Sequence, residues 1–136
     1  MLVDASVWID LFANRHTPQT ACGRRLIDEG EAVSIDDLTL MKVLQGIRSS
    51  GDFERMNSRL RLFEQVTVVD RESAIEAARN YRTLRALGIT VRKTIDTLIA
   101  TRCILDSMPL LYSDRDFDPF VEHLGLISAL DATGVN

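Results

Sequence analysis

Four aspartates stand at positions where their carboxylates could act together. They are Asp4, Asp96, Asp114 and Asp116. The first follows a short apolar strand predicted over residues 2–3, and the last two follow a strand predicted over 109–112. The remaining one lies in the first turn of a helix predicted over 95–105. Because ligand sites in open α/β sheets gather at the carboxyl ends of the strands, we expect these side chains to share one acidic pocket.

Crowded carboxylates repel one another and need a positive partner to stay ionised together. Oxygen-only ligation favours Mg²⁺ or Mn²⁺, and such an ion can activate water and stabilise charge on a phosphate. Each aspartate also has a structural explanation. Asp96 could complement a helix dipole, and Asp114 and Asp116 could form an Asx-turn. Only their joint placement favours a metal site.

Strands alternating with helices predict a single α/β domain over residues 1–136, with a mostly parallel sheet of four or five strands. The strands are predicted over residues 2–3, 32–35, 66–69, 109–112 and, as a possible fifth, 124–127. Asp36 or Asp37 is expected to cap one helix, Asp52 the next and Thr94 the one that carries Asp96. Trp8 and Phe12, four residues apart, are expected to pack in the core or at a dimer contact rather than stack on bases.

The composition is that of an ordinary globular protein, with 46% hydrophobic and 26% charged residues. There is no apolar run of transmembrane length and no secretory signal pattern at the N-terminus. Cys22 and Cys103 form no metal-spaced set and are expected to be reduced thiols, so we expect a cytoplasmic protein. The net charge of −4 argues against a protein that coats nucleic acid electrostatically.

Four segments resemble those of the PIN-domain nucleases, specifically the ribonuclease toxins of VapBC-type toxin–antitoxin systems. The segments are residues 2–10, 40–47, 91–100 and 110–117, in this order. The resemblance implies a three-layer sandwich around the sheet. It also implies an Mg²⁺- or Mn²⁺-dependent endoribonuclease that acts on RNA, forms a homodimer and binds a cognate antitoxin protein. By the same resemblance, Asp4, Asp96 and Asp114 hold the metal, Asp116 is an accessory carboxylate, and Ser6 orients Asp4 or a bound water.

One position departs from the family pattern, in which a glutamate stands four residues before a glycine. Here the segment ends at Gly46, and Lys42 occupies the acidic position. An ammonium there would pair with Asp4 or Asp96 and compete with a metal ion for space and charge. The prediction is therefore a toxin ribonuclease whose activity Lys42 impairs. Lys42 could instead be a surface lysine that extends along an exposed helix face. Its apolar neighbours make this interpretation weaker than a place in the acidic site.

Two alternatives come from other classes. The chain could be a catalytically inactive PIN-like module that binds RNA or an antitoxin, or a phosphotransfer domain with a nucleophilic aspartate. The retained aspartates favour the nuclease, and no lysine and hydroxyl set around Asp4 supports phosphotransfer. Arg115, between two site aspartates, is the best candidate for a phosphate contact, and we expect it to pair with those aspartates when RNA is absent.

Overall fold

The computed structural model describes residues 1–132 and has a parallel sheet at its centre. Its strands are β1 (Leu2–Val3), β2 (Ser34–Asp36), β3 (Glu64–Val66) and β4 (Leu110–Leu111), in the order β3-β2-β1-β4. Leu2 is in register with Ser34 on one side and with Leu110 on the other, and every pairing is parallel. This confirms the predicted α/β class with four strands.

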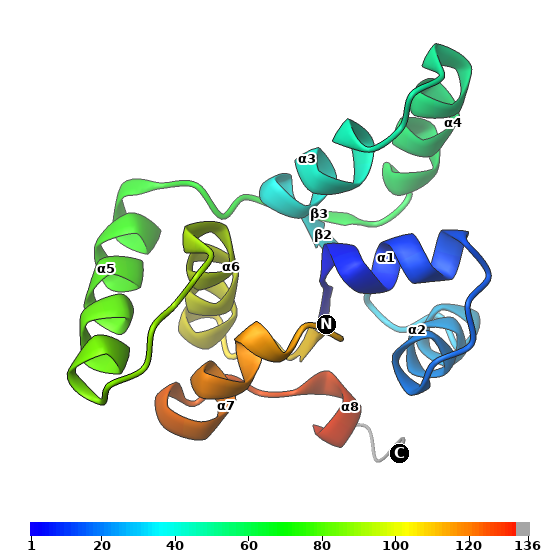
Figure 1. Cartoon of the computed structure of the whole chain (residues 1–136). Coiled ribbons are helices and arrows are strands. Elements are labelled where there is room, and N and C mark those ends of the chain that lie inside the picture. Colours follow the sequence, from blue (N-terminus) through cyan, green and yellow to red (C-terminus); the bar gives the residue numbers. More distant parts are fainter. Residues whose placement is uncertain (133–136) are drawn as a thin grey trace.

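The helices cover both faces of this sheet (Figure 1). They are α1 (Ala5–Phe12), α2 (Pro18–Asp28), α3 (Asp37–Gln45), α4 (Ser50–Leu60), α5 (Arg71–Ala86), α6 (Thr94–Leu105), the 3₁₀ turn η1 (Arg115–Phe117), α7 (Asp118–Leu124) and α8 (Ala129–Ala132). None of them, within residues 1–132, is long and apolar enough to cross a membrane.

Alternation along the strands divides the core between the two faces of the sheet. Leu2 and Leu110 face α5, α6 and α7, in a cluster with buried residues such as Phe117. Val3 and Leu111 face the opposite way and pack with α1 and α2. These two apolar clusters, with the sheet between them, form the three layers that the family resemblance implies.

Trp8 belongs to this second cluster, with a side chain that is 1% exposed. Its ring stacks on Phe12 at a centroid distance of 5.9 Å and meets the edge of Phe63 at 4.8 Å. Core packing, the first of the expected roles, is therefore confirmed for Trp8.

Two predicted strands differ most from the structure, whereas those over 32–35 and 109–112 overlap β2 and β4. Residues 124–127 form no strand, because α7 extends to Leu124 and Gly125 ends it with a φ of 80°. After it, Ser128 forms an isolated bridge to Leu110, whose N–H donates to the Ile127 carbonyl at 2.9 Å. The strand predicted over 66–69 begins and ends earlier, as β3. The reason is that the Val68 N–H donates to the Asp37 carboxylate at 3.0 Å, which takes this segment out of the strand ladder.

Hydrogen bonds at the helix starts explain where several elements begin. Asp36 caps α3 by accepting from the Thr39 N–H at 3.0 Å, as predicted. Asp52 does not cap α4; its N–H donates to Ser49, whose hydroxyl caps the helix one turn earlier. Thr94 does not cap α6 either, since Lys93 stands at that position and makes no side-chain capping bond.

Candidate active site

The neighbouring strands β1 and β4 bring Asp4 and Asp114 to one end of the sheet. Asp4 directly follows β1, and its N–H donates to the Leu111 carbonyl of β4 at 2.9 Å. Asp4 then caps α1, and Asp114 caps η1 just beyond β4. Because β1 and β4 are parallel neighbours, both carboxylates emerge at the same end of the sheet.

Three carboxylates form a compact group that could hold a cation. One oxygen of each of Asp96, Asp114 and Asp116 lies within 4.8 Å of the others. Asp116, expected only as an accessory residue, thus belongs to this group, whereas Asp4 stands beside it. Asp4 interacts electrostatically with this group: burial raises the pKa of Asp96, and the negative charge of Asp4 adds to that rise.

Two buried oxygens at this site, Oδ1 of Asp4 and Oδ2 of Asp96, have no hydrogen-bond partner within the described part of the chain. The side chains that carry them are 3% and 2% exposed. The other oxygen of Asp4 is held in place, because it accepts from the Ser6 hydroxyl at 2.7 Å and from the Ser6 N–H at 3.3 Å. Buried oxygens are rarely left unsatisfied, so an all-oxygen site with two free lone-pair donors fits a hard divalent cation.

Lys42 reaches into this site from α3. Its Nζ donates to Oδ1 of Asp96 at 3.1 Å, across a pair whose side chains are 24% and 2% exposed. Burial raises the pKa of Asp96, and the hydrogen bond and charge of Lys42 partly oppose that rise. Lys42 therefore serves as a counter-charge in the site and does not extend along an exposed helix face.

A second lysine, Lys93, contacts the other side of the group. Its Nζ lies 2.8 Å from Oδ2 of Asp114 and 3.7 Å from Oδ2 of Asp116. Burial alone would raise the pKa of Asp114, but hydrogen bonds from Lys93 and from the Asp116 N–H outweigh it and lower that pKa. The hydrogen bond to Asp114 in turn raises the pKa of Lys93.

Residues 1–121 match the PIN domain family. The chain belongs to the PIN domain family. Among similar proteins, "VapC ribonuclease Mb1587" of Mycobacterium bovis and "Ribonuclease VapC11" of Mycobacterium tuberculosis are each 28% identical over 119 residues. Each alignment covers 87% of this chain and 89% of the relative.

Solved structures support the PIN fold over nearly the whole chain. A toxin–antitoxin complex from Klebsiella pneumoniae aligns with a TM-score of 0.68 and 19% identity, covering 94% of this chain and 96% of the other. The chain of VapBC2 from Rickettsia felis, solved with a promoter DNA fragment, aligns with a TM-score of 0.73 and 14% identity, covering 93% and 95%. At these identities the likeness establishes the fold.

Arg115, the other predicted site cation of this PIN domain, is placed differently from our expectation. Its side chain is exposed, and no ion pair within residues 1–132 joins it to Asp114 or Asp116. Lys93 takes that role instead. In the sequence, both Lys93 and Arg115 lie within three positions of a site aspartate, so only the geometry distinguishes them.

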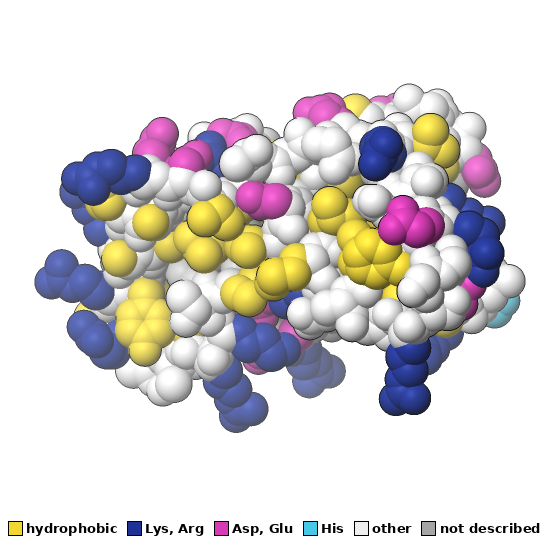
Figure 2. Space-filling model, turned by 90° about the horizontal axis from the view of Figure 1, so that it is seen from above, with side chains coloured by type: hydrophobic (Ala, Val, Ile, Leu, Met, Phe, Trp, Pro, Cys, Tyr) yellow, Lys and Arg dark blue, Asp and Glu magenta, His cyan; other side chains and the backbone are white. Residues whose placement is uncertain are grey.

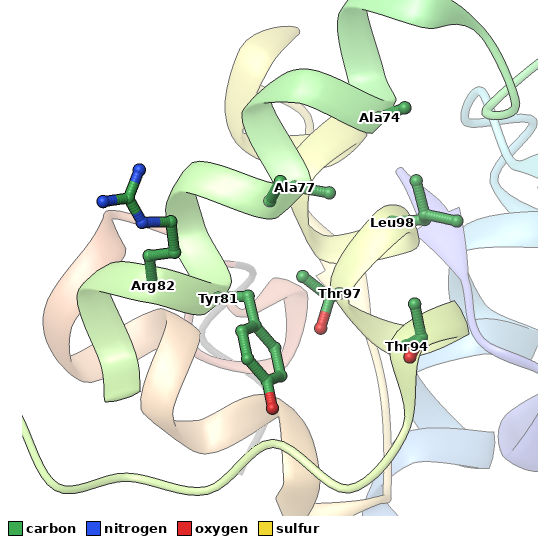
Figure 3. A pocket seen from close by; sticks show the side chains of 8 residues that line it. Ala74, Ala77, Tyr81, Arg82, Thr94, Thr97 and Leu98 are labelled. Atoms are coloured by element: carbon green, nitrogen blue, oxygen red, sulfur yellow. The ribbon is translucent and has the colours of Figure 1, made fainter. Parts of the chain in front are cut away.

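An apolar pocket lies away from these carboxylates. It is a surface cavity of about 450 Å³ between α5 and α6, lined by alanines of α5 with Tyr81, Thr97 and Leu98 (Figure 3). The carboxylates of the PIN site do not line it, because Thr94 and Thr97 turn toward α5 while Asp96 turns toward the sheet edge. It is therefore a feature of helix packing separate from the acidic site.

Proposed function

We propose that this PIN domain, a single domain over residues 1–136, is the toxin of a type II toxin–antitoxin system and an endoribonuclease that hydrolyses RNA phosphodiesters. The observation that carries the proposal is the acidic site itself, in which carboxylates from three separate segments converge and two buried oxygens have no hydrogen-bond partner among residues 1–132. The relatives named as VapC ribonucleases support RNA as the substrate class.

The residues that we propose as metal ligands are Asp4, Asp96 and Asp114, with Asp116 as an accessory carboxylate. A bound Mg²⁺ or Mn²⁺ supplies a polarised water and positive charge near the scissile phosphate. Ser6 fixes the carboxylate of Asp4 through two hydrogen bonds, so that its free oxygen keeps one orientation. Arg115, exposed at the rim, is suited to a phosphate contact.

We also propose that Lys42 weakens the nuclease. Its ammonium already neutralises the most buried carboxylate of the group, Asp96, at 3.1 Å. A divalent cation that binds there meets a positive charge where the family pattern has a negative one, so both charge and space oppose it. Metal affinity therefore falls, while the arrangement of the carboxylates is kept.

The proposed partners are a cognate antitoxin and a second copy of the chain, in the cytoplasm. The solved relatives that contain toxin–antitoxin pairs support the first. Exposed apolar side chains support an interface: Met41 on α3 is 46% exposed and Ile9 on α1 is 45% exposed. Figure 2 shows a broad band of hydrophobic side chains across one face of the molecule, with lysines and arginines as well as acidic side chains around it.

The experiment compares the present chain with Lys42→Glu on a labelled RNA in Mg²⁺, in Mn²⁺ and in EDTA. We expect slow or no cleavage by the present chain and metal-dependent cleavage by Lys42→Glu. Asp96→Asn in the Lys42→Glu chain is the matched control and should abolish cleavage. If Lys42→Glu restores neither metal binding nor RNA cleavage, the account of Lys42 as an inhibitor is wrong.

One observation favours a second candidate, a catalytically inactive PIN-like module that binds RNA or an antitoxin. The Lys42–Asp96 pair satisfies part of the acidic site without any metal. This candidate predicts RNA binding that is unaffected by Mg²⁺ and absence of cleavage in both chains. Cleavage of RNA by Lys42→Glu would exclude this candidate, because it would show that no other position of the chain abolishes the nuclease activity.

A further inference from the structure

Lys93 stands where the rules of helix formation disfavour a cation. It is the N-cap of α6, with an extended backbone and no side-chain capping bond. Ser, Thr, Asp and Asn are preferred at this position, and a positive charge near a helix N-terminus opposes the helix dipole. The stability of α6 therefore gives no reason for a lysine here.

The ammonium of Lys93 is instead directed at the acidic group. It lies 2.8 Å from Oδ2 of Asp114 and 3.7 Å from Oδ2 of Asp116. The same two carboxylates, together with Asp96, form the cluster that could ligate a cation. A second observation points to a cation there, because buried Oδ2 of Asp96 has no hydrogen-bond partner among residues 1–132.

We propose that Lys93 is a positioning residue, the resident counter-cation of Asp114 and Asp116, and that it leaves them when a divalent cation binds. This inference rests on the proposed function, since it concerns the same metal site. Oxygen Oδ2 of Asp114 cannot face the ammonium at 2.8 Å and also be a metal ligand without bringing two positive charges together. The ammonium in its present place therefore opposes the binding of a metal ion at Asp114.

Exposure separates the two lysines of the site. The side chain of Lys93 is 52% exposed, so its stem can turn outward without disturbing the core. The side chain of Lys42 is 24% exposed and pairs with the buried Asp96, so it is a fixed counter-charge. Once released, the ammonium of Lys93 stands at the rim of the site, where it can contact a phosphodiester of the substrate.

The test is the affinity for Mn²⁺, measured by calorimetry in the Lys42→Glu chain and in three derivatives of it. Lys93→Met removes the charge and keeps most of the stem, Lys93→Arg keeps the charge, and Arg92→Met is the matched control at the exposed neighbouring cation. We expect Lys93→Met to tighten Mn²⁺ binding about tenfold, since one nearby positive charge is removed. Arg92→Met and Lys93→Arg should stay within about twofold.

An Mn²⁺ affinity of Lys93→Met equal to that of Arg92→Met overturns the inference, as does the absence of Mn²⁺ binding in every variant. RNA cleavage by Lys42→Glu distinguishes the two proposals. If Lys42→Glu cleaves RNA and Lys93→Met leaves Mn²⁺ affinity unchanged, only the role of Lys93 fails. If Lys93→Met tightens Mn²⁺ binding and Lys42→Glu does not cleave RNA, the role of Lys93 stands and the nuclease proposal fails.

Discussion

Replacing Lys42 with methionine removes the cation that faces Asp96 and keeps a flexible apolar stem of similar length. The ammonium lies 3.1 Å from Oδ1 of Asp96, a side chain that is 2% exposed. Removing one partner of a buried pair costs about 3–5 kcal/mol, because the other charge stays buried without compensation. Lys42 is itself 24% exposed, so water screens part of the interaction, and we expect a loss of about 2 kcal/mol.

Urea unfolding at pH 7 in EDTA measures this loss, since the chelator prevents a divalent ion from replacing the lysine. With an m value of about 2 kcal/mol/M for a domain of this size, the unfolding midpoint should fall by about 1 M. Arg115→Met is the control, because it removes an exposed cation that makes no ion pair with Asp114 or Asp116. Its effect on the free energy of unfolding should stay within about 0.5 kcal/mol.

The loss should depend on pH in a defined direction. Burial raises the pKa of Asp96 above its ordinary value of 3.8, and Lys42 opposes that rise. Without Lys42 the pKa of Asp96 rises further. In the pH range between its unfolded and folded pKa values, the folded state then binds more protons than the unfolded state. Stability then falls as the pH rises through this interval. The destabilisation by Lys42→Met should therefore be full at pH 7 and shrink once the pH falls below the folded pKa of Asp96.

A double-mutant cycle with Asp96→Asn decides whether the ion pair is the cause. In the Asp96→Asn chain residue 96 is neutral, so Lys42→Met should lower the free energy of unfolding much less than in the present chain. An equal loss in both chains, or a loss that does not vary with pH, would refute the reasoning.

Three further predictions concern other parts of the chain. Asp36→Asn keeps the cap on Thr39 and removes a buried charge whose pKa is raised by desolvation. This change should stabilise the fold by about 1 kcal/mol at neutral pH, and the gain should vanish below the folded pKa of Asp36. A gain that does not vary with pH would contradict this explanation. Gly125→Ala, at a φ of 80°, should cost about 1 kcal/mol, whereas Gly46→Ala, at a φ of −80°, should be neutral in the same melts. Arg115→Ala should weaken binding of uncleaved RNA and reduce the salt slope by about one; an unchanged slope removes its phosphate contact.

Sequence reasoning located the acidic site because strand ends and helix starts carry local signals. Asp4 and Asp114 directly follow short apolar runs, and parallel strands fix where such residues meet. The partner of Asp114 had no such signal: Lys93 and Arg115 flank the site equally in sequence, and only the geometry shows that Lys93 makes the contact.

The differences in the fold have similar causes. Residues 66–69 have the composition of a strand, but a tertiary hydrogen bond from Val68 to Asp37 ends β3 earlier. Residues 124–127 are equally apolar, and the left-handed Gly125 decides their path. In each case a single long-range contact or backbone angle overrides local propensity.

The pairing of β1 with β4 has a consequence for synthesis of the protein. Leu2 pairs with Leu110, so two neighbouring strands of the sheet come from segments far apart in the sequence. Closing a loop of this length precedes any gain from the contacts it makes, which delays such pairings in folding. The acidic pocket therefore cannot assemble before the segment that carries Asp114 and Asp116 has left the ribosome. A nuclease with this topology stays inactive until that point of its synthesis.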